Sequence, residues 1–115
     1  HVRVPVKLIN GDKTVTVNAL VDTGFTIMVI TKDVANALGL KPLCKVGVGL
    51  ADGSGWVVNY TAVEVELMNR RTLVIAAIVE GKEVLIGVEV LERLGLAIDL
   101  VSGKLYETRG FVTRI

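Results

Sequence analysis

Three consecutive residues, Asp22, Thr23 and Gly24, carry the groups best suited to chemistry, and they follow a short apolar stretch at 19–21. An Asp before Thr and Gly often closes an Asx turn, so one interpretation of Asp22 is purely structural. A second interpretation is catalytic, because a carboxylate at the end of an apolar strand can take up and release protons. Gly24 would let a ligand or another backbone come close. The catalytic interpretation raises a question, since hydrolysis at a carboxylate site usually needs two carboxylates.

Two glycine-bearing segments further along the chain are also candidates. Asp52-Gly53-Ser54-Gly55 separates two strand-like stretches and predicts a hairpin tip, either an ordinary turn or a lid over a bound chain. Gly87 ends an apolar stretch and precedes a helical pattern, where it relieves crowding or lets the helix pack under a neighbouring loop. Gly47-Val48-Gly49 has the G-x-G spacing, but no helix is expected after it, so a dinucleotide site is not favoured.

Composition excludes several classes of chemistry. The chain has one Cys, Cys44, and one His, His1, so it cannot form an intrachain disulfide, a Cys/His zinc site or an internal His-based catalytic triad. We therefore expect no metal and no cofactor, and we expect Cys44 to be a small buried apolar residue. Any chemistry must use carboxylates, lysines, hydroxyls or the backbone. The single Cys and the absence of Gln are typical of thermophiles.

Length and charge set further limits. We expect 115 residues to form one domain, residues 1–115. A net charge of +1 with 4% aromatic residues does not favour nucleic-acid binding, which needs a basic surface and stacking side chains. No apolar run is long enough to span a bilayer and no secretory signal is visible, so we expect no membrane span and a cytoplasmic location.

The remaining pattern predicts mostly β structure. Asn10-Gly11-Asp12 is a hairpin turn signal, Asn69-Arg70 is a further turn, and Thr31 and Gly39 are expected to cap a helix that buries Val34, Ala37 and Leu38. Antiparallel strands with two short helices favour a closed, barrel-like sheet. Strands are predicted at 2–9, 13–21, 27–30, 45–50, 56–68, 72–79, 83–87, 96–100, 104–107 and 111–115, and helices at 31–38 and 88–94.

Taken together, these motifs carry a family resemblance. Ala19-Leu20-Val21-Asp22-Thr23-Gly24 resembles the apolar-Asp-Thr-Gly motif of aspartic proteases. Val84-Leu85-Ile86-Gly87, with Leu91 and Leu94-Gly95 after it, resembles the second signature of that family, and the glycine-rich hairpin lies where the family has its flap. The order and spacing are similar to those of the single-domain, retropepsin-like branch, and we expect a prokaryotic or archaeal member.

The resemblance implies an answer to the question of the single carboxylate. In that branch each chain supplies one Asp, so a C2 homodimer would form the site from two copies of Asp22. The implied activity is aspartic endopeptidase, with a water activated between the two carboxylates. The terminal segments 1–6 and 110–115 are the candidates for building the dimer sheet, and the sequence does not show which of them does so.

Further site residues follow from the same resemblance. Thr23 would hydrogen-bond across to the partner's loop, and Gly24 would lie along the substrate backbone. The peptide would bind as an added strand under the flap. The flap tip would be Asp52, Gly53 and Ser54, and Leu20 and Leu85 would line apolar subsites.

The chain departs from the family pattern at two positions. Phe25 stands where a small residue usually follows Gly24, and Glu89 stands where Asp or Asn is common. Because Phe25 can narrow the pocket, the alternative is a non-catalytic dimeric module that binds peptides. Asp-Thr-Gly after a strand also resembles phosphoryl-transfer loops, but those folds need parallel sheets and long helices, so nucleotide chemistry is not favoured.

Overall fold

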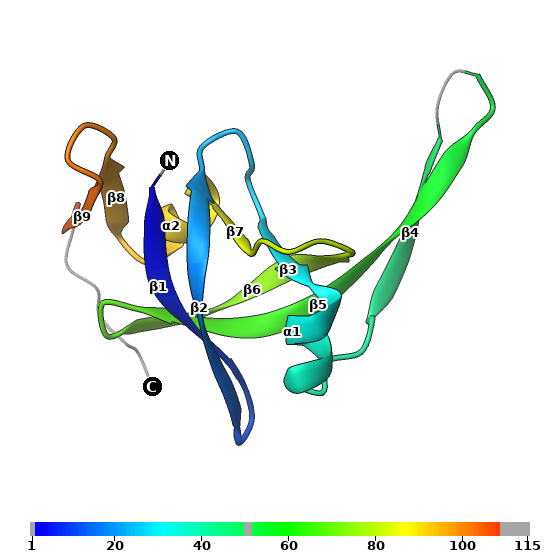
Figure 1. Cartoon of the computed structure of the whole chain (residues 1–115), viewed down its shortest axis with the longest axis horizontal. Coiled ribbons are helices and arrows are strands. Elements are labelled where there is room, and N and C mark those ends of the chain that lie inside the picture. Colours follow the sequence, from blue (N-terminus) through cyan, green and yellow to red (C-terminus); the bar gives the residue numbers. More distant parts are fainter. Residues whose placement is uncertain (1, 50–51, 109–115) are drawn as a thin grey trace.

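The computed structural model describes residues 2–49 and 52–108 of the chain, and its architecture is mostly β (Figure 1). The predicted strand 111–115, and the proposed dimer segment 110–115, lie outside the described residues. No helix among the described residues is long and apolar enough to cross a membrane. The elements are β1 Arg3–Asn10, β2 Lys13–Asp22, β3 Met28–Thr31, α1 Lys32–Ala37, β4 Cys44–Gly49, β5 Gly55–Leu67, β6 Arg70–Val79, β7 Leu85–Gly87, α2 Val88–Arg93, β8 Leu96–Asp99 and β9 Lys104–Glu107.

Six strands close into a barrel, as the sequence predicts. Their order is β1-β2-β7-β3-β6-β5, and pairing of β1 with β5 closes the ring, while β4 extends from the free edge of β5. β7 is a three-residue strand inserted between β2 and β3, parallel to the first and antiparallel to the second. β8 and β9 form a separate two-stranded sheet.

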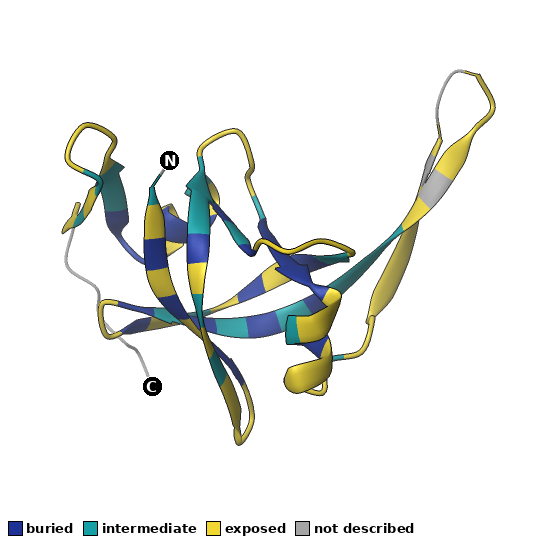
Figure 2. Ribbon diagram, in the orientation of Figure 1, coloured by how far each residue is buried: buried dark blue, intermediate teal, exposed yellow. Residues whose placement is uncertain are grey.

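Alternation along the strands separates the core from the outer face. On β2, Ala19 is fully buried and Val17 packs against the core, whereas Thr16 and Asn18 are exposed. The Gly11-Asp12 turn joins β1 and β2 in the expected register, with Gly11 at a φ of 61°. Figure 2 shows the buried residues along the strands of the barrel, while the turns and most of the β4–β5 hairpin are exposed. The largest fully buried side chains include Leu8, Met28, Ile30, Leu38, Ile86, Leu91 and Leu94.

Both helices begin and end as the sequence predicts. The Thr31 hydroxyl oxygen accepts a hydrogen bond from the Val34 N–H at 3.2 Å, and Gly39 follows α1 with a φ of 66°. The predicted buried face was wrong at one position, because Ala37 is exposed and Ala35 is buried instead. The inward face of α1 still has helical i, i+3 and i+4 spacing, since Ala35 and Leu38 are buried and Val34 packs against the core, and the helix contacts β2, β3 and β6.

Strands β4 and β5 continue beyond the barrel as a long hairpin, which we call the flap (Figures 1 and 2). The predicted burial of Cys44 was wrong: its thiol is exposed. The reason is topological, since β4 pairs only with β5 and reaches away from the core. Val46 and Val57, on the same hairpin, are exposed for the same reason.

The β5–β6 turn and the C-terminal hairpin are linked by a buried arginine. The turn consists of Met68 and Asn69, both with positive φ, so Arg70 is the first residue of β6 and not part of the turn as predicted. Its guanidinium donates to the carbonyl oxygens of Leu94 and Gly95 at 2.8 and 3.2 Å and forms an ion pair with Glu107 at 3.0 Å. Arg70 therefore holds the end of α2 and strand β9 to the barrel.

Candidate active site

Asp22 is the last residue of β2, at an edge of the barrel. In the β2–β7 pair, Leu20 lies opposite Leu85 and Asp22 lies opposite Gly87. Asp22 shares the outer face of β2 with Leu20, because side chains two residues apart on a strand point to the same side. The next residue, Val21, packs against the core and faces the other way. The strand therefore anchors Asp22, and the residue as a whole is only partly buried.

The loop after Asp22 is ordered by its own hydrogen bonds. The Asp22 Oδ1 atom accepts from the Gly24 N–H at 2.9 Å, and the Asp22 carbonyl accepts from the Phe25 N–H at 3.2 Å. This is the Asx turn that the structural interpretation predicts. It is compatible with the catalytic interpretation, since the turn fixes the carboxylate and the bond at Oδ1 leaves Oδ2 for other partners. A Cβ on Gly24 would lie 3.2 Å from Oδ1, so this position favours glycine.

Gly87, at the junction of β7 and α2, packs directly against this loop. A Cβ at Gly87 would lie 2.5 Å from the carbonyl oxygen of Phe25 and 2.6 Å from that of Ile27. Both distances are too short for a non-bonded contact, so any residue other than glycine would clash here. The Val88 N–H donates to the same Phe25 oxygen at 3.0 Å. Of the two sequence interpretations of Gly87, the structure therefore supports close packing of the strand–helix junction against the 23–27 loop.

Leu20 and Leu85, predicted to line apolar subsites, are brought side by side. They are partners across β2 and β7, both are partly buried, and the Leu20 N–H donates to the Val84 carbonyl at 2.9 Å. Thr23 and Phe25 are exposed next to them, with 42% of Phe25 accessible. An acid, a hydroxyl and an apolar surface thus meet at one end of β2.

The flap tip carries its own acid. The Asp52 Oδ1 atom accepts from the Ser54 hydroxyl at 2.6 Å and from the Ser54 N–H at 2.9 Å. These two hydrogen bonds lower the pKa of Asp52 below its usual value, and the bond from the hydroxyl has the larger effect. The flap tip is therefore negatively charged at neutral pH. Gly53 has a φ of 88°, which favours glycine. In Figure 1 the flap and the loop after β2 point to the same side of the molecule.

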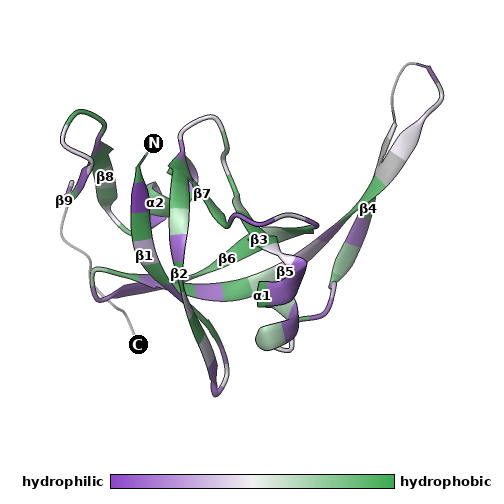
Figure 3. Ribbon diagram, in the orientation of Figure 1, coloured by the Kyte–Doolittle hydropathy of each residue, from purple (hydrophilic) through white to green (hydrophobic). Residues whose placement is uncertain are grey.

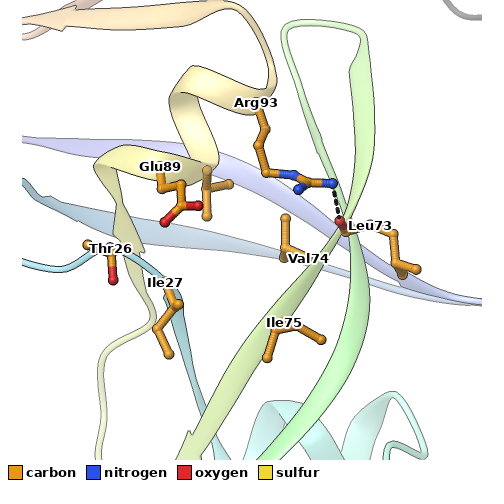
Figure 4. A pocket seen from close by; sticks show the side chains of 8 residues that line it. Thr26, Ile27, Leu73, Val74, Ile75, Glu89 and Arg93 are labelled. Carbon is orange, nitrogen blue, oxygen red and sulfur yellow. Dashed lines mark hydrogen bonds between the residues drawn. The ribbon is translucent and has the colours of Figure 1, made fainter.

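Two surface cavities flank the loop that follows Asp22. The first, about 280 Å³, lies between that loop, β6 and α2, and Figure 4 shows Glu89 and Arg93 at its rim, with Arg93 donating to the Leu73 carbonyl at 3.2 Å. The second, about 430 Å³, lies between α2 and β8 and includes Thr23. In the sequence Glu89 stands out only as a departure from the family pattern, and no local pattern indicates that α2 borders a cavity. Within residues 2–49 and 52–108, no cluster of three or more His, Cys, Asp or Glu residues could hold a metal ion.

We compared the sequence and the fold of the chain with those of known proteins. Residues 7–93 match the sequence model of the family described as gag-polyprotein putative aspartyl protease, and the chain belongs to that family. Among solved structures, the EIAV protease complexed with the inhibitor HBY-793 has the same fold, with a TM-score of 0.59 and 22% identity over 85% of this chain and 91% of that one. No curated protein sequence matches the chain. The chain is thus a retropepsin-like aspartic protease by family and fold, as its motifs predict.

Proposed function

We propose that the chain is a homodimeric aspartic endopeptidase whose catalytic pair consists of Asp22 from each of two copies. The observation that carries the proposal is the position of Asp22 in a chain of the aspartyl protease family. It is partly buried at the end of β2, its Oδ1 is held by the Gly24 N–H, and Leu20 and Leu85 lie beside it. Hydrolysis by this mechanism requires two carboxylates, and the second comes from another copy of the chain related by a twofold axis.

The proposed mechanism follows from pairing two carboxylates. Two such groups at contact distance share one proton, because ionising both is electrostatically costly. The ionised Asp22 takes a proton from a water molecule, which attacks the peptide carbonyl carbon. The protonated Asp22 of the other copy donates its proton to the carbonyl oxygen, and a carboxyl then protonates the leaving nitrogen.

The surrounding residues are assigned to binding. A peptide bound between the barrel and the flap would add as an extended strand, with alternate side chains entering pockets. In this proposal Leu20 and Leu85 contact apolar substrate side chains, and Gly24 lies along the peptide backbone. Asp52, Gly53 and Ser54 cover the peptide from the flap tip, where the negative charge of Asp52 disfavours acidic residues nearby. Thr23 hydrogen-bonds to the partner's loop and stabilises the pair.

The test is cleavage by the wild type and by Asp22→Asn. Both proteins would be incubated with a denatured-protein substrate and a peptide library from acid to neutral pH, with and without pepstatin. We expect Asp22→Asn to abolish cleavage, because the amide cannot exchange the required proton, while the variant keeps the size and circular dichroism spectrum of the wild type. Asp12→Asn is the matched control, since Asp12 is an exposed turn residue at the opposite end of β2 and should leave cleavage unchanged.

Full peptidase activity in a pure Asp22→Asn preparation would contradict the proposal. The alternative, a non-catalytic dimeric module that binds peptides, is favoured by one observation, the exposed Phe25 ring directly after the Asx turn. Such a module would bind peptides without cleaving them and would keep that binding in Asp22→Asn. Loss of pepstatin binding together with loss of cleavage in the variant would favour the enzyme.

A further inference from the structure

Asn59, on β5, has a buried side-chain oxygen without a partner. The residue as a whole is partly exposed, but its Oδ1 atom is enclosed and forms no hydrogen bond with the described residues. Burying an acceptor without a donor is unfavourable, and native proteins rarely keep such an atom. Exchanging the two ends of the amide would not remove the cost, because an N–H group would then be buried in the same place. Packing alone therefore does not account for Asn59.

Asn59 lies on the side of β5 that continues the inner face of the barrel. Side chains two residues apart on a strand point to the same side, and Thr61 and Val63 on this side are buried. Directly opposite Asn59 are Ile78 on β6, which packs against the core, and Lys45 on β4. Asn59 and Lys45 thus lie where the flap leaves the barrel, and we call this pair the root of the flap.

Lys45 supplies a positive charge beside Asn59. Cross-strand partners share a face of the sheet, with Cβ atoms about 4.5–5.5 Å apart. Lys45 is exposed and takes part in none of the ion pairs found among the described residues. The first acid after Ile78 along the chain, Glu80, is already paired with Lys32 at 2.9 Å. Figure 3 shows hydrophilic stretches on both β4 and β5 at the root, so a charged ligand group would meet polar surface there.

The root and the tip of the flap carry opposite charges. Asp52 makes the tip negative, whereas Lys45 makes the root positive. Lys45 precedes Gly49, the last residue of β4, by four positions, which is about 13 Å along the strand. That separation exceeds the roughly 8 Å over which exposed charges act at physiological ionic strength, so Asp52 does not cancel the charge of Lys45. An acidic side chain is therefore attracted to the root and repelled at the tip.

We propose that Lys45 and Asn59 form a subsite for an acidic side chain of a bound peptide, so that the chain selects peptides with Glu or Asp at the position held against the root of the flap. The Lys45 ammonium group donates to the carboxylate, and the Asn59 amide adds its N–H groups as donors. This inference rests on the proposed function, because it takes a peptide to bind between the barrel and the flap. It adds the class of peptide that is bound.

The experiment is to measure peptide dissociation constants by fluorescence anisotropy in the Asp22→Asn background, where cleavage does not disturb binding. A labelled apolar peptide would carry Glu, Gln or Lys at a single position, which is moved stepwise along the peptide. At one position we expect Glu to bind about three- to tenfold more tightly than Gln, with Lys the weakest. Lys45→Met should abolish this preference. Lys104→Met is the matched control and should keep it, because Lys104 is exposed on β9, away from the flap (Figure 1).

Asn59→Leu distinguishes binding from a role in the fold. Because Oδ1 has no partner, an apolar side chain of similar size should leave the urea unfolding midpoint unchanged or raise it. The same variant should weaken binding of the Glu peptide at least about threefold. A variant that loses stability but binds the Glu peptide as before would show that Asn59 serves the fold, and would overturn the subsite.

The outcomes separate the subsite from the enzyme, because binding is measured without reference to cleavage. A preference for Glu that is lost in Lys45→Met but kept in Lys104→Met supports the subsite, even where the wild type does not cleave peptides. Equal binding of the Glu and Gln peptides at every position overturns the subsite, even where cleavage requires Asp22. Failure of every peptide in the series to bind also overturns it.

Discussion

Gly87 lies so close to Phe25 that the two residues fix the position of the loop after Asp22. The Phe25 carbonyl oxygen would stand 2.5 Å from any Cβ at position 87, and it accepts the Val88 N–H at 3.0 Å. The start of α2 therefore supports the same loop whose other end is held by the Asp22 carboxylate. Two segments more than sixty residues apart act as one unit, because only glycine leaves room for the contact.

We expect Gly87→Ala to destabilise the fold and to impair cleavage. The added methyl group must push the 25–27 backbone away, and overpacking of this kind costs about 1–3 kcal/mol. Urea denaturation would measure the stability, and peptide cleavage at matched folded concentration would measure activity. Gly47→Ala is the stability control, since a Cβ there meets nothing within 4 Å. Equal stability of the two variants would contradict the packing role of Gly87.

Phe25→Ala should change which substrates are cleaved and leave the loop intact. The bonds that hold Phe25 use its backbone N–H and carbonyl, so they persist without the ring. Removing a 42% exposed ring beside the site enlarges the adjoining space. We expect bulkier side chains near the scissile bond to be accepted, as measured by kcat/KM on a peptide series with a graded residue. A variant with an unchanged size preference would show that the ring does not face the substrate.

We expect Arg70→Met to be far more destabilising than Arg71→Met. Arg70 is 8% exposed, and its loss leaves the Leu94 and Gly95 carbonyls and the Glu107 carboxylate without their cation, at a cost of about 2–4 kcal/mol. Arg71 lies on the exposed face and pairs with Glu64 and Glu66, so its replacement should change stability little. Urea titrations of the two variants test this directly. Similar unfolding midpoints would mean that Arg70 does not hold the end of α2.

Stability should depend on pH through the pair of Arg3 and Glu83, which joins β1 to the segment before β7 at 2.6 Å. The hydrogen bond from Arg3 lowers the pKa of Glu83 below its usual value of 4.5. Folding therefore favours the ionised form, so the stabilisation is present above that value and is lost as the pH falls through the folded pKa. Glu83→Gln should flatten the loss of stability in acid, though modestly, because both side chains are exposed.

The matched experiment for this pair is a double-mutant cycle. Urea unfolding would be measured from about pH 3 to pH 7 for the wild type, Arg3→Met, Glu83→Gln and the double variant. In the Arg3→Met background we expect Glu83→Gln to have a much smaller effect on the acid slope. An equal effect in both backgrounds would show that Glu83 acts through some other contact.

Several predictions from the sequence are not tested by the structure or the comparisons. The dimer, the roles of the site residues, the single domain of 115 residues and the cytoplasmic location stay predictions. The prokaryotic or archaeal origin and the thermophilic character also stay predictions. The fold class and the family, in contrast, are confirmed by the closed barrel, the family match over residues 7–93 and the fold of the EIAV protease.

The sequence alone determined the features that depend on neighbouring residues. The Gly11-Asp12 turn, the Thr31 cap, the Asx turn at Asp22 and the glycine stop after each helix use contacts within a few positions, so their chemistry is readable from the chain. Only the tertiary structure decided the exposure of Cys44, the burial of Arg70 and the contact of Gly87 with Phe25. Those outcomes depend on which distant strands pair. The pairing of β1 with β5 and the insertion of β7 between β2 and β3 are set by packing of the whole core. A local sequence pattern contributes only a part of that packing and therefore does not determine it.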